Sequence, residues 1–152
     1  MKKLLIFMLT VLFVQSVLAD QCLSPSHISI SKNPATGKFD VNLPAGSGYQ
    51  YIGDNYPISA SGPISFVNVK VMSRDYPSAP SGPYSNIFAE RDIECTYGVD
   101  ESSTGSYPGG IFILSKTASR GISYDLSEKW SYRGGFYYIC WYDAQACHFN
   151  PH

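Results

Sequence analysis

Apolar and polar residues alternate along much of the chain with a period of two. The clearest case is residues 39–43, where Phe39, Val41 and Leu43 are separated by single polar residues. Successive side chains of a β-strand point to opposite faces, so this pattern predicts a strand with one buried face and one wet face.

Related patterns predict further strands, and none of them has the spacing of an amphipathic helix over three turns. One helical turn within residues 125–130 is the most helix that the sequence predicts. In residues 93–99, Cys95 falls on the apolar side of the alternation and is therefore expected to point inward. The other strands are expected within residues 27–31, 49–52, 64–72, 87–89, 111–114 and 122–126.

Turn residues separate these segments at short intervals. The chain has ten prolines and 13 glycines, and Asn33-Pro34 followed by Gly37 marks one tight reversal between residues 32 and 37. Pro fixes φ and Gly supplies the positive φ that tight turns need. The sequence therefore predicts an all-β fold, a single antiparallel β-sandwich or barrel-like domain of about nine or ten short strands.

The segment Gly134–Phe149 is the richest in aromatic residues, with two cysteines, one tryptophan and five other aromatics. We expect it to form a terminal hairpin around which the other strands are organised. In its first strand Tyr137 and Trp141 share one face and Cys140 lies on the other. One face belongs to the core, and the second is either covered as well or serves as an aromatic recognition surface.

A short internal repeat also carries tyrosine. Tyr56-Pro57 is followed by Ser-Gly-Pro and Ser, and the same residues recur from Tyr76, with six identities in ten aligned positions. A shared loop shape explains the repeat, and a duplicated ligand loop is the sharper alternative. With 12 tyrosines in the chain, the residues predicted to bind a partner are Tyr137, Trp141, Tyr56 and Tyr76.

The first 19 residues have the form of a secretory signal peptide. Two lysines precede an apolar block that is too short to cross a bilayer, and small residues precede the expected cleavage site after Ala19. We expect residues 20–152 to form the single all-β domain, secreted or periplasmic, with no membrane insertion after signal cleavage.

The four cysteines all follow the predicted cleavage site, and an even number in an oxidising compartment predicts two disulfides. Three pairings are possible. Cys140 and Cys147 would face each other across a tight turn at Asp143-Ala144, which leaves Cys22 with Cys95, and the other pairings stay open.

Charge argues against nucleic acid as a partner. Cleavage removes two of 11 basic residues and none of the 12 acidic ones, which leaves a formal charge of −3. The remaining Lys and Arg residues are scattered singly, whereas a phosphate-binding groove needs them clustered.

Catalytic and metal-binding patterns are weak. Cys147, His148 and His152 lie within six residues, but Pro151 prevents the helix that would bring the two histidines together, so no metal and no cofactor is predicted. No Gly-x-Ser-x-Gly nucleophile motif is present, and disulfides would occupy the four thiols. Carboxylates such as Glu90 and Asp92 are the only raw material for a glycoside hydrolase, and no catalytic residue is predicted.

The cysteine pattern carries one resemblance. Cys22, the segment Glu94–Tyr97, Cys140 and Cys147–Phe149 resemble a family of short secreted proteins of gammaproteobacteria known as a domain of unknown function, although Leu23 stands where Pro is expected. The resemblance implies an exported, disulfide-bonded domain and supplies no activity.

The first functional hypothesis is therefore a non-enzymatic module that binds a protein, peptide or glycan. A small hydrolase acting on envelope or host glycans is one alternative. An inhibitor of an enzyme such as lysozyme is another, with the loop Asp100–Gly110 as its contact element.

Overall fold

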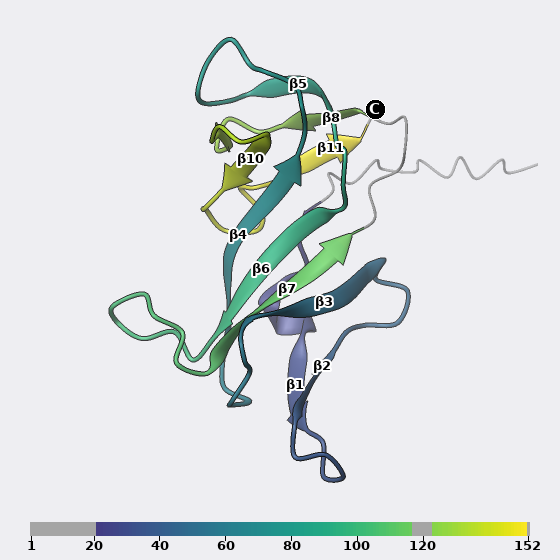
Figure 1. The fold of residues 1–152 in the computed structure, drawn as a ribbon, viewed down its shortest axis with the longest axis vertical. Coiled ribbons are helices and arrows are strands. Elements are labelled where there is room, and N and C mark those ends of the chain that lie inside the picture. The colour runs from purple at the N-terminus through teal and green to yellow at the C-terminus, as the bar shows by residue number, and fades with distance from the viewer. Residues whose placement is uncertain (1–20, 117–122, 152) are drawn as a thin grey trace, which may run out of the picture.

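The computed structural model describes residues 21–116 and 123–151, and the predicted signal peptide lies outside this part of the chain. The fold is almost entirely β, as predicted, and Figure 1 shows its strands. A short 3-10 turn, η1 (Pro25–His27), precedes them. The strands are β1 (Ser29–Lys32), β2 (Phe39–Asn42), β3 (Tyr49–Tyr56), β4 (Ile64–Met72), β5 (Tyr84–Phe88), β6 (Ile93–Val99), β7 (Gly110–Lys116), β8 (Ser123–Leu126), β9 (Ser131–Tyr132), β10 (Tyr137–Cys140) and β11 (Phe149–Pro151).

The strands within residues 21–116 and 123–151 form three sheets, and every paired strand is antiparallel to its neighbour. The large sheet has the order β3-β7-β6-β4-β10-β9, the small sheet has the order β11-β8-β5, and β1 and β2 form a separate hairpin (Figure 1). No helix in residues 21–116 and 123–151 is long and apolar enough to span a membrane.

The core lies between the large and small sheets, and strand register explains its composition. Across four neighbouring strands of the large sheet, Cys140 is level with Val69, Val69 with Cys95, and Cys95 with Leu114. All four are fully buried. Because residues level with one another in a sheet share a face, the side chains of Cys140 and Cys95 both point to the core side of the large sheet. The prediction that Cys95 points inward is confirmed.

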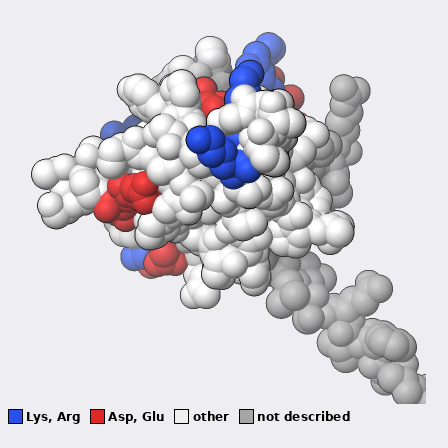
Figure 2. Space-filling view, turned by 90° about the horizontal axis from the view of Figure 1, so that it is seen from below, with Lys and Arg blue, Asp and Glu red and all other residues white. Residues whose placement is uncertain are grey.

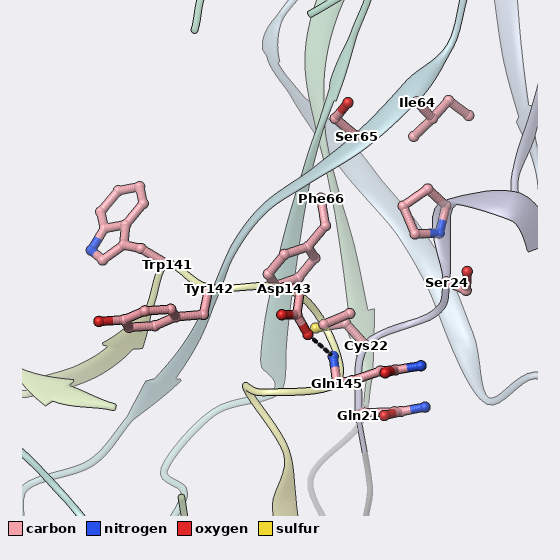
Figure 3. Close-up of a pocket in the computed structure, with 12 residues that line it drawn as sticks. Gln21, Cys22, Ser24, Ile64, Ser65, Phe66, Trp141, Tyr142, Asp143 and Gln145 are labelled. Atoms are coloured by element: carbon pink, nitrogen blue, oxygen red, sulfur yellow. Dashed lines mark hydrogen bonds between the residues drawn. The ribbon is translucent and has the colours of Figure 1, made fainter. Parts of the chain in front are cut away.

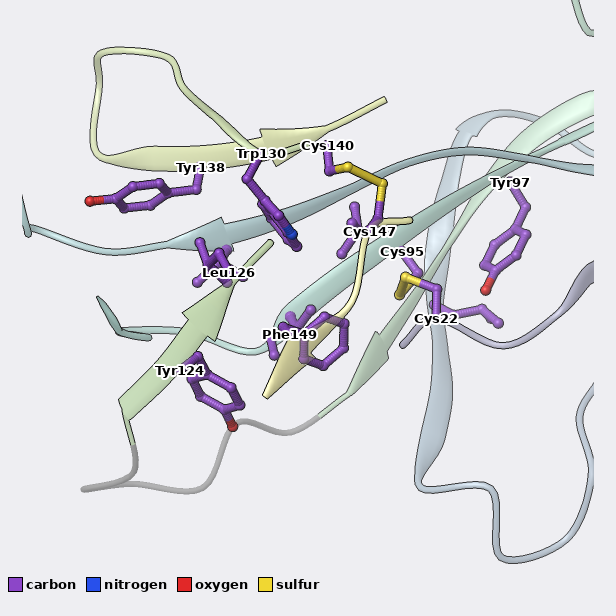
Figure 4. Close-up of a cluster of buried hydrophobic side chains, with 14 of the residues drawn as sticks. Cys22, Cys95, Tyr97, Tyr124, Leu126, Trp130, Tyr138, Cys140, Cys147 and Phe149 are labelled. Atoms are coloured by element: carbon purple, nitrogen blue, oxygen red, sulfur yellow. A yellow bond between two sulfur atoms is a disulfide. The ribbon is translucent and has the colours of Figure 1, made fainter. Parts of the chain in front are cut away.

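The small sheet closes this core from the opposite side, as Figure 4 shows. Leu126 and Phe149 are buried, and the fully buried Trp130 packs edge-to-face against Phe149 with their ring centroids 6.4 Å apart. The indole Nε1–H of Trp130 donates to the carbonyl oxygen of His148 at 3.1 Å. A buried indole needs such a partner, so this bond fixes the ring within the core.

The predicted turn between residues 32 and 37 is confirmed. The Asn33 Oδ1 atom accepts from the amides of Ala35 and Thr36, and Gly37 has a φ of +70°. This turn joins β1 to β2. The expected helical turn in residues 125–130 is wrong, because β8 continues to Leu126 and a tight turn follows it.

Both favoured disulfide pairings are confirmed. Cys22 is bonded to Cys95 and Cys140 to Cys147, with sequence separations of 73 and 7 residues. The first disulfide ties the N-terminal segment to the centre of the large sheet. The second closes a short loop after β10.

The predicted terminal hairpin is wrong. β10 pairs with β4 and β9 in the large sheet, whereas β11 pairs with β8 in the small sheet. The intervening loop does not reverse the chain onto β10, because Asp143 caps a turn of its own. Its carboxylate accepts from the amides of Gln145 and Ala146, and its carbonyl oxygen accepts from the Cys147 amide. The chain therefore crosses between sheets at this point.

Candidate binding site

The four residues predicted to bind a partner do not come together. Tyr56, Tyr76 and Trp141 are 65%, 71% and 56% exposed, while Tyr137 is half-buried. Each of the three exposed residues lines a different depression of the surface. The sequence therefore found exposed aromatic side chains without finding a single site.

Trp141 lies at the start of the loop that the Cys140–Cys147 disulfide closes. Its neighbour Tyr142 is equally exposed, at 56%. Two large aromatic rings thus stand next to each other on a loop of six residues held at both ends by one covalent bond. The disulfide and the Asp143 turn together restrict the backbone on which these rings are carried.

A groove of about 640 Å³ runs beside this loop, and we call it the Trp141 groove (Figure 3). One side comes from the disulfide loop, another from the N-terminal segment and the third from the beginning of β4. Figure 3 shows Trp141 and Tyr142 at one end, and Phe66 and Asp143 between them and the N-terminal segment. The lining residues are Gln21, Cys22, Ser24, Pro25, Ile64, Ser65, Phe66, Trp141, Tyr142, Asp143, Ala144 and Gln145.

The N-terminal side of the groove is fixed to the core at two consecutive residues. Cys22 is disulfide-bonded to Cys95, and the carbonyl oxygen of Leu23 accepts a hydrogen bond of 2.8 Å from the Tyr97 hydroxyl. Tyr97 is fully buried and stacks on Phe112, and burial raises its pKa above the ordinary tyrosine value. It therefore keeps its proton and remains a donor. The N-terminal side and the loop side of the groove are thus each held by a disulfide.

The groove is almost uncharged. Asp143 is the only ionisable side chain among the lining residues apart from Tyr142, and its Oδ1 atom already accepts two backbone amides. Figure 2 shows one face of the molecule, where basic and acidic side chains occur in small separate groups on a mostly uncharged surface. The groove is suited to a largely uncharged ligand with apolar parts, because Asp143 is the one charged group in its lining and no basic side chain lines it.

Tyr76 belongs to a second aromatic cluster. Its ring lies edge-to-face against Tyr132 at 6.1 Å and against Phe136 at 5.8 Å. Tyr132 in turn contacts the fully buried Tyr138, whose hydroxyl donates to the carbonyl oxygen of Asp75 at 2.9 Å. The exposed rings in this cluster pack mainly on one another, so they extend the core to the surface.

The two copies of the internal repeat have different local structures. The peptide bond between Gly82 and Pro83 is cis, while Gly62 and Pro63 are joined in trans. Gly62 lies against the Asp100 side chain, whereas Gly82 lies against the backbone of Ser127. The two glycines thus have different neighbours, although each Gly-Pro pair leads directly into a strand, β4 or β5. A Cβ at Gly82 would lie 2.6 Å from the Ser127 carbonyl oxygen, whereas a Cβ at Gly62 would meet the Asp100 carboxylate.

The two carboxylates considered for glycoside hydrolysis, Glu90 and Asp92, each interact with a different side chain. Glu90 forms an ion pair with Arg74 at 2.8 Å, and Asp92 accepts from the Ser115 hydroxyl at 3.1 Å. Neither lines the Trp141 groove. In the described residues no group of three or more His, Cys, Asp or Glu side chains is arranged to hold a metal ion. His152 lies outside this part of the chain.

Sequence reasoning missed most of the groove. It identified Trp141, but not Tyr142, Phe66 or the segment Gln21–Pro25, because no linear pattern places residues 21–25, 64–66 and 141–145 together. The disulfide pairing was the one available signal, since it joins two of these segments to the same sheet. No protein-family model, curated protein or solved structure matches the chain, so the predicted family resemblance stays a prediction.

Proposed function

We propose that this protein is an exported, non-enzymatic binding module that takes its partner into the Trp141 groove. The observation that carries the proposal is the pair of exposed rings, Trp141 and Tyr142, on a disulfide-closed loop at one end of a groove of about 640 Å³. Tryptophan and tyrosine dominate the energetics of many interfaces because they bury a large area at a small entropic cost.

Preorganisation supports the same proposal. Binding costs free energy when a loop or side chain must be ordered, and a site held rigid in the free protein avoids much of that cost. Here the disulfide loop, the Asp143 turn and the Cys22–Cys95 disulfide hold the groove before any ligand arrives. The two disulfides also suit the oxidising compartment to which the predicted signal peptide would direct the chain.

Two immobilised collections test the proposal: a peptide array and an array of neutral oligosaccharides. The wild-type domain and the double variant Trp141→Ala/Tyr142→Ala are applied to both. The variant is expected to fold, because both side chains are more than half exposed, and to lose binding by at least about 100-fold, the effect of removing a typical hot spot.

Tyr76→Ala is the matched control, because Tyr76 is more exposed than either ring and lies in the separate aromatic cluster. It is expected to bind as the wild type does. Equal binding by the wild type and the double variant on every captured ligand contradicts the proposal.

One observation favours a second candidate, inhibition of an enzyme. The loop between β6 and β7 extends away from the sheets, as Figure 1 shows. It is braced internally, since the Ser102 hydroxyl lies 2.8 Å from that of Thr104 and 2.7 Å from that of Ser106. Rigid projecting loops are typical of protein inhibitors that insert into an active site. Replacing residues 101–107 with a short Gly-Ser linker is expected to abolish inhibition of a lysozyme if this candidate is correct, and to leave Trp141-dependent binding unchanged.

A further inference from the structure

The Trp141 groove runs along an interrupted position in the large sheet. β4 extends from Ile64 to Met72 and pairs with β6 over most of its length, but β10 pairs with β4 only from Val69 onward. After Cys140 the chain leaves the sheet for the disulfide loop. The first half of β4 therefore has a strand on one side only, and the groove lies beside it.

The hydrogen bonds at the two ends of β4 show which backbone groups face the groove. The Asp100 amide donates to the carbonyl oxygen of Pro63, so Pro63 faces β6. Since alternate residues of a strand direct their N–H and C=O groups to opposite sides, Ile64 and Phe66 direct theirs away from β6. Ser65 faces β6.

The other end of β4 gives the same result. The Ser73 amide donates to the carbonyl oxygen of Phe136, so Ser73 faces the β10 side, as Val71 and Val69 then do. If the alternation continued without a break from Val69, residue 67 would face the β10 side and Phe66 would face β6. A bulge lies between Phe66 and Asn68, however. A bulge adds one residue and reverses the alternation, so both ends agree.

Within the part of the chain that the structure describes, no backbone group accepts from or donates to Ile64 or Phe66 on this side. Two donors and two acceptors are thus aligned along one wall of the groove at strand spacing. Such an edge is a template for an added strand.

The outer edge of the sheet, formed by β3, is less suited to this role. β3 is the edge strand there, and its pairing with β7 is interrupted twice, between Tyr51 and Gly53 and between Asp54 and Tyr56. Bulges of this kind protect exposed edges from further pairing. Along Ile64–Phe66 the pairing of β4 with β6 is regular, because the bulge on this strand comes after Phe66, and the exposed rings of Trp141 and Tyr142 lie beside this edge.

We infer that the partner of the Trp141 groove is an extended, uncharged peptide segment that adds as a β-strand beside Ile64–Phe66, in the position that β10 leaves open. This inference rests on the proposed function and names its ligand class. Backbone hydrogen bonds to Ile64 and Phe66 hold the peptide, and Trp141 and Tyr142 contact its side chains. A glycan would use the aromatic rings and the polar groups of Gln21 and Gln145 without needing the strand edge.

Hydrogen exchange by NMR on the whole mature domain tests the inference. The probe is the tightest-binding peptide selected from an array of uncharged, acetylated and amidated decapeptides. Without peptide, the amides of Ile64 and Phe66 are expected to exchange rapidly and that of Ser65 slowly. Peptide at saturation is expected to slow exchange at Ile64 and Phe66 by at least about fivefold, because each amide gains a hydrogen bond, and to leave exchange at Ser65 unchanged.

Backbone N-methylation of the same peptide provides the matched test. Every second residue of an added strand directs its N–H toward β4. Methylating any one of these amides is expected to weaken binding at least about tenfold, because it removes a hydrogen bond to β4. Methylating the intervening residues, whose amides point away from β4, is expected to leave binding nearly unchanged. A peptide held only by its side chains would not show this alternation.

Other outcomes overturn the inference in distinguishable ways. If only oligosaccharides bind, with dependence on Trp141 and Tyr142, the ligand class is wrong and the proposed function stands. If no ligand depends on Trp141, both fail. If Ile64 and Phe66 become protected with rising protein concentration and no peptide, the edge pairs with a second copy of this chain instead.

Discussion

The two disulfides are expected to stabilise the domain to different degrees. A disulfide restricts the unfolded chain, and in the chain-entropy model its effect grows with the length of the loop it closes. The sequence separations of 73 and 7 residues correspond to about 4.4 kcal/mol for Cys22–Cys95 and about 2.4 kcal/mol for Cys140–Cys147 at 25 °C. Replacing each pair by alanine therefore separates the two variants by about 2 kcal/mol.

The two double variants are expected to lose nearly the same free energy from cavities in the folded state. All four cysteines are at most 1% exposed, so each double variant leaves a similar pair of small cavities. Equilibrium unfolding in urea, followed by the fluorescence of the buried Trp130, gives the two free energies. With an m value of about 2 kcal/mol/M, the Cys22→Ala/Cys95→Ala variant is expected to unfold about 1 M earlier than Cys140→Ala/Cys147→Ala.

Ligand binding by the two disulfide variants is the second measurement. Loss of the short disulfide is expected to leave a folded domain that binds more weakly, because the loop carrying Trp141 and Tyr142 is no longer held. Equal losses of stability in the two variants, or a greater loss without Cys140–Cys147, would refute the reasoning from loop length.

Three further changes test the packing and electrostatics. Gly110→Ala is expected to cost several kcal/mol in urea unfolding, since φ is +121° and a Cβ would lie 2.7 Å from the Pro57 carbonyl oxygen, whereas Gly134→Ala, with open space, is expected to be neutral. Asn68→Leu is expected to raise stability by about 1 kcal/mol, because Asn68 is 5% exposed and its Oδ1 atom has no partner. Burial and the nearby Asp75 raise the pKa of Tyr138 to about 12. The urea concentration at the unfolding midpoint is therefore expected to decrease as the pH is raised from 10 to 12, and to decrease less in the Tyr138→Phe variant.

The sign of the pH effect follows from linkage. The pKa of Tyr138 is raised above its unfolded value of 10.0, so the folded state holds the proton more tightly. Its contribution is complete below pH 10 and is lost as the pH approaches 12. A midpoint that rises over this range would contradict the assignment.

Local patterns predicted the strands well because burial on one face leaves a period of two in the sequence. Residues 39–43, 64–72 and 93–99 show this pattern, and all three form strands. β9 and the first half of β5 were missed. β9 has only two residues, and β5 contains Asn86 with a φ of +56°, so neither produces a regular alternation.

Long-range arrangement was predicted less well. The favoured disulfide pairing is confirmed, although the sequence left the other pairings open. Gly134–Phe149 was expected to be a hairpin, and its two strands belong to different sheets. Aromatic alternation cannot distinguish these arrangements, because both faces of β10 are covered within the fold. What decides is the Asp143 turn, a local hydrogen-bonding feature that hydrophobic patterning does not register.

Acrylamide quenching of tryptophan fluorescence tests the central claim most directly. Of the two tryptophans in the chain, Trp141 is exposed and Trp130 is fully buried, so quenching of the free domain reports Trp141. A ligand selected on the arrays is expected to reduce the quenching of the wild type and to leave the weak quenching of Trp141→Phe unchanged. A ligand that binds tightly while Trp141 stays fully quenchable would contradict the assignment of the groove as the binding site.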